Sequence, residues 1–183
     1  MQRTLRPLLP LVLVSCASTP SLPFHSSGPG SAPQVFAPTV VSTDERIELN
    51  AALSPDGREL SFTRLDPAGR MVLYQSRHVD GYWSAPRPIQ AFAEGEGETA
   101  VDMTYSPNGD RLTFLGRAPG GIGDPPSLDL WQMRRDGGGW TAAEVLAPPI
   151  STEHSEIYPC IVADGSLYFS SDRPGGAGDY DVY

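Results

Sequence analysis

The sequence has 183 residues, of which 13 are basic and 22 acidic, so its formal net charge is −9, and it contains no lysine. An acidic chain without a cluster of basic residues argues against nucleic acid and against an anionic membrane surface as partners. The 19 glycines and 19 prolines make up about a fifth of the chain, which favours an all-β protein rich in turns.

The first fifteen residues have the pattern of an export signal. Arg3 and Arg6 form a short positive segment, and the apolar residues 8–14 that follow are too few to span a bilayer as a helix. The four residues that end at Cys16 resemble the bacterial lipobox, in which the peptide is cut before the cysteine and the cysteine is acylated. We therefore expect residues 1–15 to be a lipoprotein signal peptide and Cys16 to be lipidated. The alternatives are an ordinary signal peptide with an incidental cysteine and a wrongly assigned start codon.

The segment after Cys16 is expected to be a tether. Residues 16–40 are rich in serine, proline and glycine and cannot bury enough apolar surface to offset the cost of ordering. His25 lies in this tether and is expected to be inert. Ala17 and Ser18 lack the aspartate that, in the sorting pattern of such lipoproteins, retains a protein at the inner membrane. The resemblance implies an outer-membrane lipoprotein that faces the periplasm or the cell exterior.

One turn motif recurs through the rest of the chain. In Ser54–Gly57, proline presets φ near −65°, aspartate can bond its own backbone, and glycine can take the positive φ of a tight hairpin. A similar turn follows after 52 residues and a looser one after another 56. Such a period indicates an array of similar units. The turn residues are Pro55, Asp56 and Gly57, then Pro107, Asn108 and Gly109, then Asp164 and Gly165.

The first unit is expected to contain four short strands. Alternating apolar residues between turns predict strands over residues 47–54, 59–64, 71–76 and 82–89. The last of these carries two prolines, which cannot donate to a ladder, so it must be an edge strand. Four strands in about fifty residues, with an edge of this kind, are typical of one blade of a β-propeller.

The second and third units repeat this pattern with altered loops. Trp83 and Trp140 each follow an aromatic residue, Tyr74 and Trp131, by nine positions, although the loop over residues 117–127 lengthens the second unit. Strands are held by packing, whereas a surface loop is free to grow. We expect propeller repeats over residues 41–183, divided into 41–92, 93–149 and an incomplete 150–183.

These motifs resemble a known family. Ser54–Gly57 followed by Leu60 and Phe62, together with the segment 171–183, resembles the WD40-like (Pro-Asp-Gly) propeller repeats of TolB-type proteins. Asn108 and the pair Val162-Ala163 depart from the usual residues, which indicates divergent blades. The resemblance implies a six- or seven-bladed propeller that serves as a binding platform without chemistry of its own. About three blades cannot close a ring, so we expect either a truncated chain or two copies that share one ring; the truncated chain is favoured.

The sequence offers little for catalysis. It has no Gly-x-Ser-x-Gly elbow and no zinc-ligand spacing, and its three histidines, His25, His78 and His154, lie in the tether and in two loops. Cys160 lies in an apolar strand and is expected to be a small buried hydrophobic residue. No catalytic residue, metal or cofactor is predicted.

Several acidic and aromatic residues have more than one interpretation. Asp172, Asp179 and Asp181 allow a calcium site, but Asp181 repeats Asp129 of the second unit, which favours a structural role in bonding turn amides. Glu94, Glu96 and Glu98 are expected in a solvated loop, and Glu48 and Glu156 are candidates for a central channel. Sugar stacking is a second interpretation of the regularly placed aromatic residues; packing between blades is favoured. They are Tyr74, Trp83, Trp131 and Trp140.

The favoured function is a non-catalytic binding or scaffold module of the bacterial cell envelope, which binds envelope proteins or a small ligand and no nucleic acid. The alternative is the propeller portion of an envelope hydrolase or lyase that acts on peptides or polysaccharides, with catalytic residues outside this chain.

Overall fold

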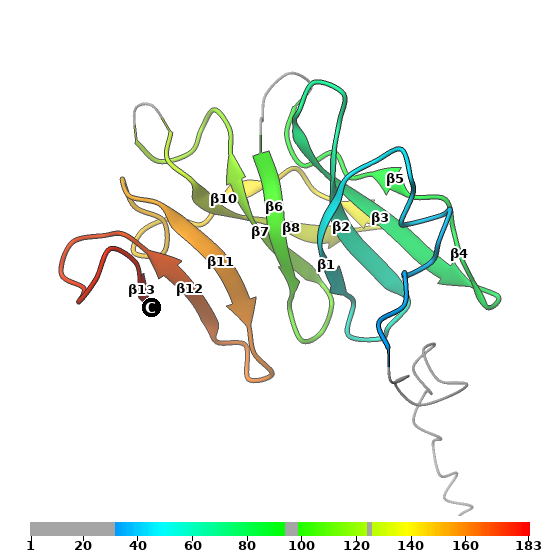
Figure 1. The fold of residues 1–183 in the computed structure, drawn as a ribbon. Helices are drawn as coiled ribbons and strands as arrows, with labels where there is room; N and C mark the ends of the chain where they lie inside the picture. Colours follow the sequence, from blue (N-terminus) through cyan, green and yellow to red (C-terminus); the bar gives the residue numbers. More distant parts are fainter. Residues whose placement is uncertain (1–31, 94–98, 124–125) are drawn as a thin grey trace, which may run out of the picture.

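The computed structural model describes residues 32–93, 99–123 and 126–183, and within these ranges the chain forms strands and loops without a helix (Figure 1). The prediction of an all-β protein is confirmed. In this part of the chain there is also no helix long and apolar enough to cross a membrane. The expectations for Cys16, His25 and the three loop glutamates (Glu94, Glu96 and Glu98) fall outside the described residues and stay predictions.

The strands fall into three consecutive units. In unit 1, β1, β2 and β3 pair antiparallel in chain order, and the short β4 and β5 both pair with β3. Unit 2 repeats this arrangement with β6, β7 and β8, while unit 3 contains β11, β12 and β13. The bounds are β1 (Glu48–Leu53), β2 (Glu59–Leu65), β3 (Met71–Val79), β4 (Tyr82–Trp83), β5 (Arg87–Pro88), β6 (Thr99–Tyr105), β7 (Arg111–Arg117), β8 (Asp129–Asp136), β9 (Gly139–Trp140), β10 (Glu144–Val145), β11 (Glu156–Ile161), β12 (Leu167–Ser171) and β13 (Asp181–Val182).

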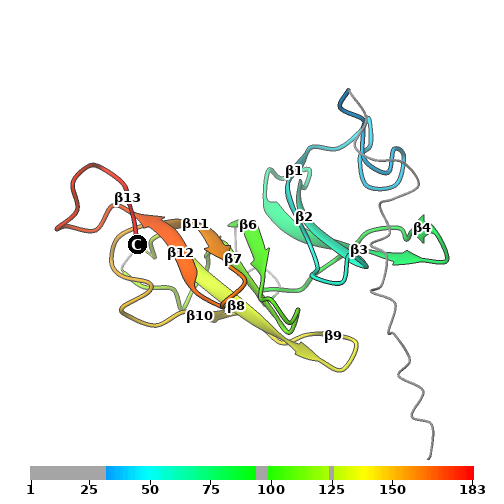
Figure 2. The same ribbon diagram turned by 90° about the horizontal axis from the view of Figure 1, so that it is seen from below.

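The units follow one another across the molecule. A parallel bridge between Met71 in β3 and Thr99 in β6 joins units 1 and 2 into one sheet, and unit 3 forms a separate sheet. Figures 1 and 2 show the three units in succession from two directions. Among the described residues these sheets do not close on themselves.

The fourth strand differs from the prediction. Residues 82–89 form two separate two-residue strands, β4 and β5, instead of one strand. The reason is shared with unit 2, which has no proline here: at the break a side-chain hydroxyl, that of Ser84 or Thr141, accepts the amide hydrogen of Arg77 or Arg134 in place of a backbone carbonyl. The edge position is as predicted, because β5 pairs with β3 alone among the described strands. Unit 2 has the same division into β9 and β10.

Each unit has two faces, because side chains alternate along a strand. In unit 1, the rear face carries Leu60, Phe62 and Tyr74, and the forward face carries Ser61, Thr63 and Leu73. The strand registers define the counterparts: on the rear face Leu112, Phe114 and Trp131 in unit 2 and Leu167, Phe169 and Tyr183 in unit 3; on the forward face Thr113, Leu115 and Leu130 in unit 2 and Tyr168, Ser170 and Val182 in unit 3.

The apolar core lies where a rear face meets the part of the chain that precedes it. The rear face of unit 2 packs in one cluster with Leu73, Ile89 and Ala91 of unit 1. In unit 1 the rear face is instead covered by residues 36–41 and packs against Val41. Phe62 and Phe114 are at most 1% exposed, and burial of a phenylalanine of this kind contributes about 1.5–3 kcal/mol.

Candidate functional site

The first strands of the three units lie side by side, β6 between β1 and β11 (Figure 1). Where they lead into their turns they surround a shallow hollow of about 410 Å³. All three units contribute to it, in contrast to the grooves that lie between two units. Its lining residues are Ala52, Leu53 and Pro55 of unit 1, Thr104, Tyr105, Ser106 and Pro107 of unit 2, and Ile161, Val162 and Ala163 of unit 3.

The rim of the hollow is made of turns with internal hydrogen bonds. In unit 1, the Gly57 amide donates to the Ser54 carbonyl at 2.8 Å, and Gly57 has φ 69°. The Ser54 hydroxyl donates to Asp56 at 2.6 Å and accepts from the Glu59 amide at 2.9 Å. The hydroxyl of Ser54 holds the pKa of Asp56 below its ordinary value.

The other two turns have the same glycine geometry, with φ 74° at Gly109 and 89° at Gly165. Ser106 and Asn108 reproduce the hydroxyl-to-side-chain hydrogen bond of unit 1 at 2.8 Å. Unit 3 has no serine at this place; there the Ser166 amide donates to Asp164 at 2.8 Å and lowers the pKa of that carboxyl. The three turns are therefore ordered by short-range hydrogen bonds, and the hollow between them is preformed.

The first strand of each unit contains a bulge at one repeated position. Asn50, Asp102 and Tyr158 each lie seven residues before the turn glycine, and each is skipped by the register of its strand pair. Asp102 and Tyr158 have φ 53° and 56°, in the left-handed region that residues other than glycine rarely adopt. The bulge takes these three residues out of the register of their strand pairs.

Two of the bulge side chains are bonded to each other. The Asn50 amide donates to the Asp102 carboxylate across β1 and β6. Burial raises the pKa of Asp102, and the Asn50 hydrogen bond opposes this rise. Tyr158 is 64% exposed. An amide, a carboxyl and a phenol thus occupy the same position in three adjacent strands. Sequence reasoning missed them because their residue types differ, although their constant distance from the turn glycine was a usable signal.

Units 1 and 2 are joined by a polar contact at the edge of the hollow. The Tyr105 hydroxyl lies 2.7 Å from the Ser61 hydroxyl and accepts from Gln75 at 3.3 Å. Burial raises the pKa of Tyr105, so this phenol stays protonated at neutral pH. Glu59 adds ion pairs to Arg77, at 3.0 Å, and to Arg135 of unit 2. These contacts hold the wall formed by unit 1 against the wall formed by unit 2.

Glu48 and Glu156 do not line an open channel, and that expectation is wrong for both. Glu156 is fully buried and pairs with Arg173 at 3.0 Å, and Glu48 pairs with Arg64 at the same distance. A buried carboxylate needs a partner, and the sequence does not show which arginine reaches it. The repeated glutamate is therefore part of the framework.

Asp172 and Asp181, two of the three aspartates that allowed a calcium site, bond backbone amides, and so does Asp129. Asp181 accepts from the amides of Ala177 and Gly178 at 2.8 and 3.1 Å, and Asp129 accepts from Ile122 at 2.8 Å. Asp172 likewise accepts from the Ser155 amide at 2.7 Å. Nowhere in the described residues do three or more His, Cys, Asp or Glu side chains gather as metal ligands would.

The two described histidines and Cys160 do not form one site. His78 packs edge-on against Trp83 in unit 1, and His154 lies 3.9 Å from Asp172 in unit 3. Cys160 is a free, exposed thiol, so the expectation of a buried residue is wrong. Its strand neighbour Tyr168 is also exposed, because no unit covers this face of the described chain.

The regularly placed aromatic residues pack in the core. Trp131 is 4% exposed, and its ring centre lies 5.0 Å from that of Phe92, which is partly buried against the same cluster. Trp140 belongs to the same cluster as Tyr105. Trp83 and Tyr74 belong to the cluster of unit 1, where Trp83 contacts Phe36. All four aromatic residues therefore pack against other side chains of the two clusters. No signal in the sequence singled out Phe36 or Phe92 as their partners.

No protein-family model matches the sequence, and no curated protein matches it.

Proposed function

We propose that this chain is a non-catalytic binding or scaffold module built from blades of a TolB-like β-propeller. The support for the propeller is the repetition of one unit three times, with the same register, bulge and turn, and with the first strands adjacent. In a propeller the first strand of each blade lies nearest the central axis. On this interpretation, β1, β6 and β11 surround that axis.

The observation that carries the binding function is the hollow of about 410 Å³ to which all three units contribute. Its walls combine apolar residues, such as Leu53 and Ile161, with the polar residues Thr104 and Ser106. Binding sites commonly combine an apolar lining with a few placed polar groups. Since the rim is already ordered, binding a ligand does not cost the conformational entropy of ordering it. A shallow, open surface of this kind suits an extended segment of another envelope protein.

The proposed location depends on the N-terminal sequence. A lipobox cysteine at position 16 and a tether up to residue 40 would hold the module away from an outer membrane. This arrangement would leave the hollow free to meet a partner in the periplasm or at the cell exterior.

Site-specific photo-crosslinking in the native cell envelope tests this proposal. A benzophenone amino acid replaces Ala163, which is exposed and lines the hollow. We expect an adduct of defined mass with an envelope protein, because the probe lies where the partner is proposed to bind. Immunoblotting measures the adduct, and mass spectrometry identifies it.

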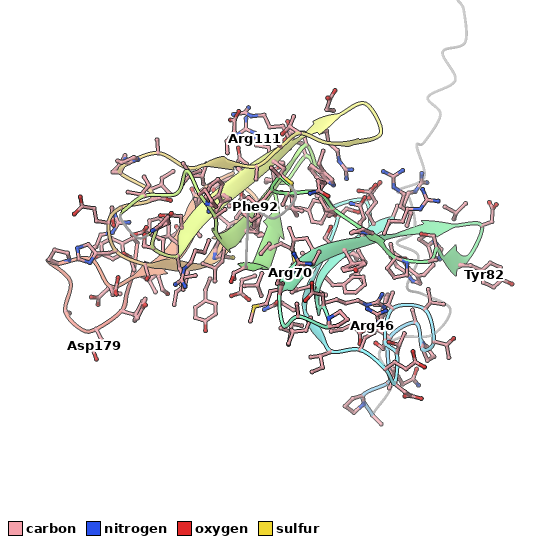
Figure 3. The ribbon with its side chains drawn as sticks, turned by 90° about the horizontal axis from the view of Figure 1, so that it is seen from above. Arg46, Arg70, Tyr82, Phe92, Arg111 and Asp179 are labelled. Carbon is pink, nitrogen blue, oxygen red and sulfur yellow. The ribbon has the colours of Figure 1, made fainter. Side chains whose placement is uncertain are left out.

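The matched control carries the same probe at Tyr82, which is 79% exposed at the tip of the β3–β4 hairpin and points away from the units (Figure 3). We expect adducts at position 163 to exceed those at position 82 several-fold. Equal labelling at the two positions, or no adduct at position 163, would contradict a binding role for the hollow.

A further inference from the structure

A groove between units 1 and 2 is separate from the proposed site. It has a volume of about 530 Å³ and shares no lining residue with the hollow. One wall comes from β3 and residues 84–90 of unit 1, and the other comes from residues 138–140 of unit 2. The volume lies within the range of about 300–1,000 Å³ that is usual for ligand sites.

The wall formed by unit 1 carries two arginines on one face. Ser61 and Arg87 are both register partners of Gln75, so Arg87 lies on the forward face, which meets unit 2. Arg77, two residues after Gln75 in β3, lies on the same face. None of the described residues that line this groove is acidic, although the whole chain has a net charge of −9. The groove is therefore a local positive site on an acidic protein.

The two arginines differ in what they contact. The Arg77 Nε lies 3.0 Å from Glu59, and the same guanidinium donates to the Gly138 carbonyl at 2.7 Å, across the junction. Glu59 also pairs with Arg135, so one carboxylate serves two arginines and a positive charge remains. Arg87 is exposed, and its side chain makes no hydrogen bond or ion pair with any described residue. One arginine is thus fixed in place and the other is available to a ligand.

Unit 2 shows that the fold does not require a positive charge at the place of Arg87. Glu144 pairs with Gln132 in the register of β8 and β10, as Arg87 pairs with Gln75 in that of β3 and β5. The same position therefore carries an acid in unit 2 and a base in unit 1. Packing of the units does not explain the charge of Arg87, which points to recognition of an anionic group.

Apolar residues line the groove beside the arginines. Ile89 is 9% exposed and belongs to the core cluster against which Trp140 packs. Val79 is 56% exposed, and Pro88 is exposed as well. Pro86 and Pro88 have no amide hydrogen, so a peptide cannot extend the sheet at β5 by a regular ladder. Recognition at this groove therefore depends on side chains.

We propose that this groove binds a short peptide segment that carries a carboxylate beside apolar side chains. The Arg87 guanidinium can donate two parallel hydrogen bonds to such a carboxylate, and the charge of Arg77 adds to the attraction. The apolar side chains of the peptide pack against Val79 and Pro88. A peptide offers both kinds of group along its length, whereas a small carboxylic acid would leave the apolar part of the groove uncovered.

A short anionic segment fits this surface better than a long polyanion does. At physiological salt, interactions between exposed charges are largely screened beyond about 8 Å. A single carboxylate in the groove is therefore attracted mainly by the arginines beside it. A long polyanion would also meet the rest of a chain that has 22 acidic and 13 basic residues. Because the groove and the hollow share no residue, this proposal does not depend on whether the hollow binds a partner.

Selection of random peptides displayed on phage tests the proposal. The peptides are selected on the full-length chain and then depleted on its Arg87→Glu variant. The fold accepts a glutamate at this place, as Glu144 of unit 2 shows. We expect the peptides that remain to combine an acidic residue with apolar neighbours, because Arg87→Glu reverses the charge that attracts them.

Fluorescence anisotropy of a remaining peptide, synthesised with a fluorescein label, measures the contact. Arg87→Gln should raise the dissociation constant about tenfold, because charge-assisted hydrogen bonds to the carboxylate are lost. Glutamine in place of the acidic residue of the peptide should raise it by the same factor. Both changes together should raise it no more than one alone, because they remove one and the same interaction.

Arg46→Gln is the matched control, since Arg46 is exposed and lies outside the groove. It should leave the dissociation constant unchanged. Ala163→Arg, which places a charge in the hollow, should also leave it unchanged, so this proposal and the proposed function can fail separately. The proposal is overturned if no peptide survives the depletion, if the surviving peptides contain no acidic residue, or if Arg87→Gln and Arg46→Gln weaken binding equally.

Discussion

Units 1 and 3 hold the segment that precedes their first strand with an arginine–glutamate pair, whereas unit 2 uses aromatic packing at the same place. Arg64 donates to Glu48 at 3.0 Å and to the Val41 carbonyl at 2.8 Å. Arg173 makes the corresponding bonds, to Glu156 at 3.0 Å and to the Ile150 carbonyl at 2.6 Å. In both units, the arginine side chain thus connects the glutamate of the first strand to the segment that precedes that strand.

The arginine also packs on two aromatic rings of the rear face. The Arg64 guanidinium lies 5.2 Å from the centre of Phe62 and 5.3 Å from that of Tyr74. Arg173 lies 5.2 and 4.8 Å from the two counterparts of these rings. Contacts of this kind contribute about 0.5–2 kcal/mol each, most where water is excluded.

Unit 2 has neither the glutamate nor the arginine, and aromatic packing takes their place. Ala100 and Gly116 occupy the places of Glu48 and Arg64 in the strand register, and Phe92 packs 5.8 Å from Phe114. The comparison shows that the arginine and the glutamate are either both present or both absent. A buried charge without its partner costs several kcal/mol, whereas an apolar replacement of both partners costs little.

The largest expected effect comes from breaking the pair in unit 3. Arg173→Met leaves Glu156, which is fully buried, without its counter-charge. We expect the free energy of unfolding, measured by urea denaturation, to fall by about 3 kcal/mol. The double variant with Glu156→Gln should lose less than the single variant, because no buried charge remains.

Arg70→Met is the control for this variant. Arg70 pairs with Asp66 at 2.7 Å, but its side chain is 53% exposed. An exposed pair contributes about 0–1 kcal/mol, so this control should change stability little. Equal losses for Arg173→Met and Arg70→Met would contradict the structural role given to the buried pair.

A smaller effect is expected from crowding the aromatic packing of unit 2. A Cβ atom on Gly116 would lie 2.8 Å from Cδ1 of Trp131 and 3.0 Å from Cζ of Phe92. Gly116→Ala should therefore lower the free energy of unfolding by about 2 kcal/mol through overpacking. Gly138→Ala, where a Cβ would meet nothing within 4 Å, is the matched control. If the two substitutions have the same effect, the packing at Gly116 is looser than described.

The smallest effect concerns the pH dependence of stability. Burial raises the pKa of Asp129, so the folded state holds this proton more tightly than the unfolded state does. The protonated carboxyl of Asp129 therefore stabilises the folded state below the unfolded pKa, near the ordinary value of 3.8. This stabilisation is lost as the pH rises through the higher folded pKa. We expect Asp129→Asn to remove this loss, so that its stability relative to wild type improves as the pH rises through that window. Urea denaturation across the window measures this difference, and a constant difference would exclude the titration of Asp129 as its source.

Much of the fold was readable in the sequence because it depends on local chemistry. The turns at Gly57, Gly109 and Gly165 need positive φ, and alternating residues on either side of them predict strands that the structure contains. The edge position of residues 82–89 followed from proline. The division of that strand into β4 and β5 was missed, because the sequence does not show that the Ser84 hydroxyl accepts the amide hydrogen of Arg77 in place of a backbone carbonyl.

The candidate site was less predictable, because its three bulge residues, Asn50, Asp102 and Tyr158, share a position but no residue type. Side-chain pairing and exposure elsewhere were equally hidden. Arg173 lies two positions beyond Ser171, the register counterpart of Arg64, so no repeat in the sequence marks it as the partner of Glu156. The sequence also does not show that Cys160 is exposed, because the strand that contains it has the same apolar pattern as a buried strand. Both depend on contacts between residues far apart in the chain.

By itself, the sequence determined where the chain turns, where it extends and that one unit recurs, because turn geometry and strand alternation act over a few neighbouring residues. Only the tertiary structure decided which face of each unit is covered, which charges are paired and that three first strands meet around one hollow. Burial and ion pairing depend on what packs against a residue from elsewhere in the chain, and that neighbour is not written beside it in the sequence.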